Sequence, residues 1–468
     1  MSRLLILIST LFMLFMLSCA DVQQGKVDGA KENFQMLPAY KLPYERQVAL
    51  KGDQWDDFRL KHPEWFAITI PPNKTDYKLL EEYDDIQVLI LAYPSTGLSS
   101  AVTKSTVEMA AAALQHMEVH VVSKSTAAQE NFTKKLKDAG VSQEMIDAKL
   151  KYIAFELDSI WMVDYGPFPI KDTEGNIAFS DLRYYHYRTW DDAIPSRLAQ
   201  LYGTTAFRGP ADFEGGNMYY DGMGTCFHTQ GAFWENPDMT QEEVQKVFSD
   251  YLGCKEFVVL KPLQGEGTTH IDMFFKLTDP KSAVLGEYTE AQDAANKKIL
   301  DDDAAILEAF TPPSGGKFRV FRLPMPDNSG TGEKIWRTYI NSTFTKPLNL
   351  WPVYSINKDL EAAALAVWEE AMPDFEHVAI NSDVVITWGG AMHCISRTVM
   401  NGTYAKWIAD GKCENNKCTA PEGGYNGDCT DDTQCYGVEM LCLCNDCKTD
   451  CKSQPSECGA ITWEGCCG

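Results

Sequence analysis

The sequence lacks the excess of positive charge that nucleic-acid-binding proteins carry. Its 66 acidic residues outnumber the 42 lysines and arginines, and the formal net charge is −24. Phosphate contacts need basic stripes, so this composition excludes nucleic acid as a partner. An acidic surface attracts cations over about 8–10 Å at physiological salt, which favours a basic ligand.

The motifs of several common enzyme classes are also missing. The chain has no Gly-x-Ser-x-Gly nucleophile elbow of a Ser/His/Asp hydrolase and no His-Glu-x-x-His of a zinc hydrolase. It also has no P-loop, and no Gly-x-Gly-x-x-Gly follows a predicted strand, which argues against a nucleotide site. We therefore expect neither a metal nor a cofactor.

Long hydrophobic runs are confined to residues 1–20. An apolar stretch from Leu4 to Leu17 precedes the small residues Ser18-Cys19-Ala20, which is typical of an export signal. Cleavage after Ala20 would release a secreted protein, whereas cleavage before Cys19 would leave the lipidated cysteine of a cell-surface or outer-membrane lipoprotein. Residues 21–45 predict an extended lead-in. Because no later segment approaches 18 apolar residues, we expect no membrane span in the mature chain.

Cysteine is scarce over most of the chain and abundant at its end. Four of the 15 cysteines lie in the first 410 residues, and the other eleven crowd residues 411–468. In an exported chain this density predicts a small disulfide module, while Cys444-x-x-Cys447 leaves a zinc site as the alternative. Because eleven is odd, we expect one tail cysteine to be free or to pair outside the module.

Between these ends, residues 46–410 alternate predicted strands and helices. Residues 85–94 predict a buried strand, and Thr240-x-x-Glu243 opens a predicted helix over 240–252 with a capping box. Strand–helix–strand units recur without a strict sequence repeat. This alternation predicts an α/β domain, and similar modules arranged around a centre would produce the same alternation.

Carboxylates occur at two predicted corners of this domain. Asp164 comes just before a Gly-Pro turn, and we expect it at the end of a strand. Glu214-Gly215-Gly216-Asn217 is a glycine-rich corner, and Tyr220-Asp221-Gly222 after it predicts a hairpin turn. Each segment could be purely structural, so the sequence leaves both interpretations open.

A histidine and a cysteine are more informative. Within residues 268–275, His270 and Asp272 alternate with apolar side chains, which predicts that both lie on one face of a strand. Burying two titratable groups there is costly unless a site uses them. Cys394 follows a predicted strand over residues 383–387 and a Gly-Gly turn, where it could be a core cysteine or a nucleophile.

These motifs occur in the order seen in a known family. Trp161-x-x-Asp164-Tyr165-Gly166-Pro167, Glu214-Gly215-Gly216-Asn217, His270-x-Asp272 and Gly390-x-x-His393-Cys394 are similar to motifs of the bacterial agmatine deiminases and peptidylarginine deiminases. The resemblance runs from about residue 40 to 410. It implies the pentein fold, a five-bladed α/β propeller, and hydrolysis of a guanidinium to a ureido group with release of ammonia.

The resemblance also implies a role for each matched residue. Cys394 would attack the guanidinium carbon and form a covalent thiouronium, and His270 would move the protons. Asp164 and Asp272 would hold the planar cation through its N–H groups. Their charges should raise the pKa of Cys394, so we expect protonated His270 or the cationic substrate to offset them. The residues expected to bind the rest of the substrate are Trp161, Glu214, Asn217, Asn341, Arg188 and His186.

Which guanidine is cleaved depends on residues outside these motifs. The segment 235–253 looks closer to the exported peptidylarginine deiminases than to the agmatine enzymes. That branch holds a C-terminal carboxylate with two arginines one residue apart, and the matching positions here read His186-Tyr187-Arg188. Val163 also stands where the branch has an arginine before the motif aspartate. Both departures weaken the expectation that C-terminal arginine is the preferred substrate.

We therefore expect an exported cysteine hydrolase that converts peptidyl or C-terminal arginine to citrulline. One alternative is an agmatine deiminase that makes N-carbamoylputrescine for putrescine biosynthesis. Another is a catalytically inactive pentein that serves as a binding scaffold. The expected partners are an arginine-containing peptide or protein, or a small guanidine, and the membrane if Cys19 is lipidated.

Overall fold

The computed structural model describes residues 36–42, 45, 54–72, 77–95, 98–328 and 335–400, and the backbone of residues 412–414 and 417–419. Contacts divide the chain into two units, Met1–Phe34 and Gln35–Gly468, and the described residues all belong to the second. The predicted export signal with Cys19 and nearly all of the predicted Cys-rich module therefore lie outside the described residues. Among the helices of the described part, none has the length and apolar character that crossing a bilayer requires.

Five mixed sheets share one internal pattern, in which an antiparallel pair of strands is followed by a parallel pair. The sheets are β1–β5–β6–β7, β8–β9–β10, β11–β12–β13, β14–β15–β16 and β17–β2–β3–β4. Their strands are β1 Tyr77–Leu79, β2 Ile86–Ala92, β3 Glu118–Val122, β4 Leu150–Ile153, β5 Phe168–Asp172, β6 Ile177–Arg183, β7 Ala206–Asp212, β8 Tyr219–Tyr220, β9 Thr225–Thr229, β10 Glu256–Leu260, β11 Phe275–Asp279, β12 Ser282–Glu287, β13 Arg319–Pro324, β14 Thr343–Thr345, β15 Leu348–Val353, β16 Glu376–Asn381 and β17 Ser396–Met400. A further antiparallel pair, β18 Lys412–Glu414 and β19 Lys417–Thr419, lies at the start of the tail.

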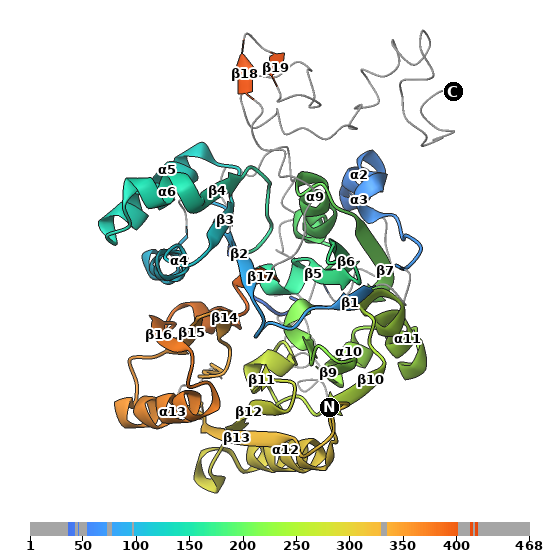
Figure 1. Cartoon of the computed structure of the whole chain (residues 1–468), viewed down its shortest axis with the longest axis vertical. Coiled ribbons are helices and arrows are strands. Elements are labelled where there is room, and N and C mark those ends of the chain that lie inside the picture. The colour runs from blue at the N-terminus through green and yellow to red at the C-terminus, as the bar shows by residue number, and fades with distance from the viewer. Residues whose placement is uncertain are drawn as a thin grey trace, which may run out of the picture. The chain divides into compact units, whose positions relative to one another are not determined.

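A helix lies in the parallel crossover of every one of these sheets, as parallel neighbours require. In Figure 1, α4, α11, α12 and α13 lie toward the outside of the drawing, and strands β5, β11 and β17 lie nearer its middle. The α-helices are α2 Gln54–Lys61, α3 Pro63–Phe66, α4 Ser100–Ala113, α5 Thr126–Asp138, α6 Gln143–Lys149, α7 Met162–Tyr165, α8 Thr189–Asp192, α9 Ile194–Leu201, α10 Gly231–Trp234, α11 Gln241–Leu252, α12 Glu290–Ala309 and α13 Lys358–Ala371. Three short 3-10 helices are η2 Gly215–Asn217, η3 Ile271–Met273 and η4 Val385–Trp388.

The local sequence explains most of these elements. β2 is buried along almost its whole length, as expected for an apolar strand with neighbours on both sides. α11 begins with both hydrogen bonds of the predicted capping box between Thr240 and Glu243. The predicted hairpin turn connects β8 and β9. The α/β class is thus confirmed, while the five-bladed arrangement, the domain boundaries and the disulfides of the tail stay predictions.

The predicted strand over residues 268–275 is wrong for all but its last residue. His270 precedes η3, and the backbone forms a turn because side chains satisfy its N–H groups. The Glu266 carboxylate accepts from the N–H groups of Thr268 and Thr269, and Asn217 Oδ1 accepts from the N–H of the residue after His270 at 3.2 Å. Only Phe275 onward, in β11, is a strand.

The predicted strand over residues 383–387 is also wrong. This segment forms η4, whose N–H groups bond to carbonyls three or four residues earlier, from Ile386 to Ser382 and from Thr387 to Val384. The β-branched composition favours a strand, but among the described residues no strand pairs with this segment. Its backbone N–H groups form hydrogen bonds to nearby carbonyls instead. Asp164 likewise lies in the short helix α7 instead of at a strand end.

Candidate active site

Most of the residues expected at the site come from segments that share one position, directly before the first strand of an antiparallel pair; Arg188 and His186 lie between β6 and α8. Asp164 precedes β5, Glu214 and Asn217 precede β8, His270 and Asp272 precede β11, Asn341 precedes β14, and Cys394 precedes β17. Neighbouring segments touch, because α7 contacts η2 and β17, η2 contacts η3, and β14 contacts β17. The repeated module therefore brings together side chains that are far apart in the sequence.

Cys394 is fully buried and is held by Asn341. Its Sγ accepts a hydrogen bond from Asn341 Nδ2 at 3.1 Å, and Asn341 Oδ1 accepts from the N–H groups of Ala391 at 3.0 Å and Cys394 at 3.3 Å. Asn341 is itself buried, so its Asn-Ser-Thr sequence does not mark a surface loop. Cys226 and Cys254 form a disulfide, whereas Cys394 is a free thiol.

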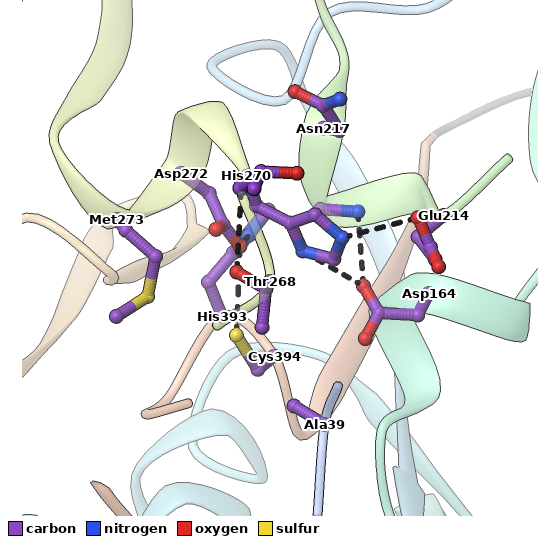
Figure 2. Close-up of polar contacts among 12 residues, drawn as sticks. Ala39, Asp164, Glu214, Asn217, Thr268, His270, Asp272, Met273, His393 and Cys394 are labelled. Carbon is purple, nitrogen blue, oxygen red and sulfur yellow. Dashed lines mark hydrogen bonds and ion pairs between the residues drawn. The ribbon is translucent and has the colours of Figure 1, made fainter. Parts of the chain in front are cut away.

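The two aspartates each keep one carboxylate oxygen without a hydrogen bond. Asp164 Oδ1 accepts from a backbone N–H at 3.2 Å, whereas its Oδ2 has no partner among the described residues. Asp272 Oδ2 lies 2.6 Å from His393 Nδ1 and 3.6 Å from Cys394 Sγ, and its Oδ1 is without a partner in the same described part (Figure 2). Buried polar atoms are rarely left unsatisfied, so these two oxygens are acceptors that the N–H groups of a ligand can use.

His270 lies between two carboxylates. Its Nδ1 is 3.6 Å from Asp164 Oδ1, and its Nε2 is 3.4 Å from Glu214 Oε2 (Figure 2). Burial would lower the pKa of His270, but the charge of Asp164 and the hydrogen bond with Glu214 outweigh it and raise the pKa to about 10. His270 is therefore positively charged at neutral pH and can give a proton to a leaving group.

The thiol and one aspartate are shifted toward their neutral forms. Burial and the charges of Asp272 and Asp164 raise the pKa of Cys394 well above its usual value, although the hydrogen bond from Asn341 opposes them. Burial also raises the pKa of Asp164 to about 7, against the charge of His270. A cation bound between the two aspartates would oppose both shifts.

Two glycines allow these groups to approach the backbone. A Cβ at Gly216 would lie 2.8 Å from His270 Nδ1 and 2.9 Å from both Asp164 Oδ1 and Asp272 Oδ2. A Cβ at Gly390 would lie 2.6 Å from the sulfur of the cysteine. Only glycine fits at either position. The first set of distances also shows that the imidazole and both carboxylates meet at one point.

Asn217, expected to bind substrate, supports the turn that carries His270 and Asp272 through its Oδ1. Its Oδ1 accepts from the N–H groups of Thr229 at 3.0 Å and Ile271 at 3.2 Å. These bonds connect η2 to η3 and fix the turn that carries His270 and Asp272. Asn217 therefore acts on the site through the backbone.

Residues 36–42 and Glu45, which we call the N-terminal strap, lie against the site. Trp161 is fully buried, and its Nε1 donates to the carbonyl of Leu37 at 2.8 Å. The N–H of Ala39 donates to the carbonyl of Trp388 at 2.8 Å, and the Ala39 carbonyl accepts from the Tyr185 hydroxyl at 3.1 Å. With the strap in place, Cys394, His270, Asp164 and Asp272 are at most 2 % exposed.

Arg188 is buried and paired with the strap, whereas His186 is exposed. Arg188 Nε and Nη2 donate to the two carboxylate oxygens of Glu45 at 2.9 Å and 3.0 Å, and Nη1 donates to the Tyr184 hydroxyl at 3.1 Å. The ring of His186 contacts that of Tyr187 at a centroid distance of 5.9 Å. The structure therefore does not bring His186 to the cysteine, and it gives Arg188 a carboxylate from the same chain.

The sequence indicates no role for three charged residues that form a connected group with Asp272. They are His393, Glu82 and Lys276. A lysine in the apolar run Phe274-Phe275-Lys276-Leu277 is the one available signal, because a buried lysine needs an acidic partner. Glu82 gives no signal, since it stands among acidic residues that resemble a solvated surface. Among the described residues, no group of three or more His, Cys, Asp or Glu side chains is arranged to hold a metal ion.

Comparisons with known proteins identify the family of this chain. Residues 78–399 match the family model of the Porphyromonas-type peptidyl-arginine deiminase. A protein of Shewanella sp. (strain MR-7) named "Putative agmatine deiminase" is 24% identical over 298 residues, which cover 56% of this chain and 79% of that protein.

Two solved structures share the fold at lower identity. The agmatine deiminase of Enterococcus faecalis aligns with a TM-score of 0.64 and 20% identity, over 72% of this chain and 99% of that one. The "Putative Arginine Deiminase" of Porphyromonas gingivalis aligns with a TM-score of 0.62 and 21% identity, over 70% of this chain and all of that one (100%).

Fold and site together define a deiminase, an enzyme that hydrolyses C–N bonds of guanidino groups, with the mixed α/β fold of the pentein deiminases. Within that class, the chain belongs to the Porphyromonas-type peptidyl-arginine deiminase family.

Proposed function

We propose that this protein hydrolyses the guanidinium of arginine in peptides or proteins, producing citrulline and ammonia through a covalent intermediate on Cys394. One observation carries the proposal. In one buried site, Cys394 Sγ lies 3.6 Å from Asp272 Oδ2, while Asp164 Oδ2 and Asp272 Oδ1 have no hydrogen-bond partner among the described residues. A planar cation with N–H groups on two edges would supply both missing donors and present its carbon to the sulfur.

In the first half-reaction the sulfur replaces an amino group on the guanidinium carbon. The thiol loses its proton as the cation enters, and the C–S bond forms. His270 then protonates the departing nitrogen, the C–N bond breaks, and ammonia leaves a thiouronium on Cys394. The proton gained by the ammonia thus comes from His270, which becomes neutral, the thiol proton is released to solvent, and the positive charge stays on the thiouronium.

In the second half-reaction water replaces the sulfur. His270, now neutral, removes a proton from the water, whose oxygen attacks the thiouronium carbon. The C–S bond breaks, the second proton of the water passes to the sulfur, and the neutral ureido product leaves while His270 keeps the first proton. Asn341 holds the sulfur in place, and Glu214 keeps His270 between the two carboxylates.

The contact between Arg188 and Glu45 bears on whether the substrate arginine is internal or C-terminal in its peptide. In this structure Glu45 occupies the guanidinium of Arg188 with two hydrogen bonds. A C-terminal carboxylate would have to displace that buried pair. We therefore favour arginine inside a peptide over C-terminal arginine.

Agmatine is the second candidate substrate. Agmatine has the same guanidinium but no carboxylate, so its binding does not require Arg188 to leave Glu45. The name of the Shewanella relative and the deep burial of Cys394 both support a small guanidine. Free arginine would bring a carboxylate close to the acidic site, and we expect it to be a poorer substrate than agmatine or either peptide.

A panel assay of ammonia and ureido formation tests these proposals. The panel contains a peptide with internal arginine, a peptide with C-terminal arginine, agmatine and free arginine, with Cys394→Ala as the control. We expect the internal-arginine peptide to have the highest kcat/KM and the control to release no ammonia. Preference for agmatine would replace the first candidate with the second. Hydrolysis of no guanidine by the wild type would instead favour the inactive scaffold.

We also propose that the protein is exported, either secreted or held at the surface by a lipidated Cys19. The buried disulfide between Cys226 and Cys254 supports this, since such bonds persist mainly in oxidising compartments. Cell fractionation with mass spectrometry of the N-terminal peptide would identify the route. An intact Met1 on cytoplasmic protein would contradict export.

The five sheets of one repeating pattern support a five-bladed propeller as the arrangement of the domain. Each sheet carries a site segment at the same position, as blades around a common centre would. An experimental structure of the domain tests this proposal. Sheets that do not follow one another around the site would contradict it.

A further inference from the structure

Next to Asp272 lies a buried chain of charged groups that the proposed reaction steps do not use. His393 Nδ1 lies 2.6 Å from Asp272 Oδ2, and its Nε2 lies 3.0 Å from both carboxylate oxygens of Glu82. Lys276 Nζ donates to Glu82 Oε2 at 2.8 Å. The side chains of His393, Lys276 and Glu82 are 3 %, 0 % and 16 % exposed. Such a chain is costly to bury unless every member is paired.

The geometry favours the imidazolium form of His393. Both ring nitrogens face carboxylate oxygens within hydrogen-bond distance. A neutral imidazole has one N–H, so one nitrogen would direct its lone pair at a carboxylate. Only the imidazolium donates to both Asp272 and Glu82. Burial opposes this charge, but the two carboxylates outweigh it and raise the pKa of His393.

The charges of this group balance. Asp272 and Glu82 supply two negative charges, and His393 and Lys276 supply two positive charges. Other polar neighbours of the group are Tyr219, whose ring lies 5.7 Å from that of His393 and whose hydroxyl accepts from Lys276 at 3.3 Å, Arg397, whose charge acts on Glu82, and the thiol of Cys394. On the side of the substrate, the charge of Asp272 also acts on Asp164 and His270. Asp272 therefore faces Cys394 through an oxygen, Oδ2, that also contacts the cation of His393.

We infer that His393, kept as an imidazolium by Glu82, is a positioning residue that turns Asp272 Oδ1 toward the guanidinium and weakens the repulsion between Asp272 and the thiolate of Cys394. The hydrogen bond to Oδ2 leaves only Oδ1 for the substrate, which is the oxygen without a partner among the described residues. This inference rests on the proposed role of Cys394 as the nucleophile.

The two effects have different kinetic signatures. Removing the positive charge but keeping a donor to Asp272 makes the site more negative, so a cationic substrate binds at least as tightly while the thiolate forms less readily. The turnover number then falls without a rise in KM. Removing the donor as well releases Asp272 from its orientation, and KM rises. A purely structural role would not separate these outcomes.

Two variants of one residue test the inference. His393→Asn keeps an N–H at the position of Nδ1 without the charge, and His393→Leu removes both. We expect His393→Asn to lower kcat at least 10-fold with KM unchanged or lower, and to raise the apparent pKa of the Cys394 thiol by about one unit. We expect His393→Leu to lower kcat/KM at least 100-fold, with a higher KM.

His120→Asn is the matched control. His120 is a buried histidine on β3 whose Nε2 lies 3.0 Å from Glu118 and whose Nδ1 lies 2.7 Å from the hydroxyl of Tyr202, and neither of these contacts involves Asp272, His393 or Cys394. We expect this variant to keep wild-type kcat, KM and thiol titration. A wild-type kcat and thiol titration in His393→Asn, or a raised KM with unchanged kcat, would overturn the inference.

Neutron diffraction of the wild-type crystal at neutral pH gives a readout that does not depend on the folding of any variant. We expect deuterium on both ring nitrogens of His393. Density on only one of them would overturn the inference. If the wild type hydrolyses no guanidine, the proposed function fails, whereas the deuterium positions and the thiol titration still decide the state of His393 and its effect on Cys394.

Discussion

At the scale of single residues, Gly216 shows how closely the side chains of the site pack against the backbone. A Cβ there would lie within 2.9 Å of the imidazole of His270 and of one oxygen of each site aspartate. We expect Gly216→Ala to lower kcat/KM at least 100-fold, because the methyl group would displace His270 or the carboxylates from the substrate by a few tenths of an ångström or more. Steady-state kinetics on the best panel substrate measures the loss.

Gly286→Ala is the control for that variant. Its Cβ would meet Met325 Cγ at 3.0 Å, which is the flexible side chain of a residue outside the site. We expect a small loss of stability and unchanged kcat/KM. Wild-type activity in Gly216→Ala would show that the three groups do not converge on the reacting atoms.

The protonation of Cys394 gives a second prediction at this scale. Because burial and the charges of Asp272 and Asp164 raise the pKa of the thiol, the free enzyme should contain little thiolate at neutral pH. A bound cation opposes the charges of both aspartates, so the apparent pKa should fall, by about one unit or more, when an unreactive guanidinium ligand binds. Ultraviolet absorbance of the thiolate against pH, as the difference between wild type and Cys394→Ala, measures it. An apparent pKa unchanged by ligand would mean that the substrate does not assist.

The sequence predicts some of these residues better than others. Asp164, His270, Asp272 and Cys394 stand in ordered motifs, so a resemblance finds them. His393 stands in a motif as well, but its charge depends on Glu82, which comes from a part of the chain with no visible pattern. The role of His393 depends on its contacts with residues far away in the sequence, and the sequence around His393 does not reveal those contacts.

At the scale of elements, the turn before a strand is the feature that builds the site. Local composition misleads there, since residues 268–275 and 383–387 have the pattern of strands but form η3 and η4. In each case side chains or local carbonyls satisfy the backbone N–H groups, so the chain turns where composition favours extension. Elements whose own residues satisfy the backbone, such as α11 with its capping box, are predicted correctly.

The N-terminal strap makes a prediction about substrate choice. Glu45 occupies Arg188 in a fully buried pair, with side chains 1 % and 0 % exposed. We expect Glu45→Ala to raise kcat/KM for a peptide with C-terminal arginine about 10-fold relative to internal arginine, because Arg188 becomes available to a carboxylate. The loss of Glu45 also leaves a buried charge unpaired, at a cost to stability of about 3–5 kcal/mol.

The double variant Glu45→Ala/Arg188→Ala checks that prediction. The relative gain for C-terminal arginine should disappear when Arg188 is also removed. A gain that persists in the double variant would show that the strap acts by covering the site, and that Arg188 does not select the substrate.

At the scale of the whole molecule, the repeating sheet pattern explains why functional residues spread over more than half of the chain. The alternation of strands and helices predicts the α/β class, but not which strands pair. The pairing of β17 with β2 joins the two ends of the domain in one sheet, with Ser396 opposite Leu91. Cys394 is therefore placed by residues some 300 positions earlier in the chain, which explains why its environment could not be derived from its own segment.

The central claim is that the sulfur of Cys394 attacks a guanidinium held by Asp164 and Asp272. Acid quenching during turnover, followed by digestion and mass spectrometry of the peptide that contains Cys394, tests it most directly. We predict that this peptide gains the mass of the substrate minus ammonia, and that Cys394→Ser gains nothing and releases no ammonia. Steady release of ammonia by the wild type with an unmodified Cys394 peptide, together with activity in Cys394→Ser, would contradict the account.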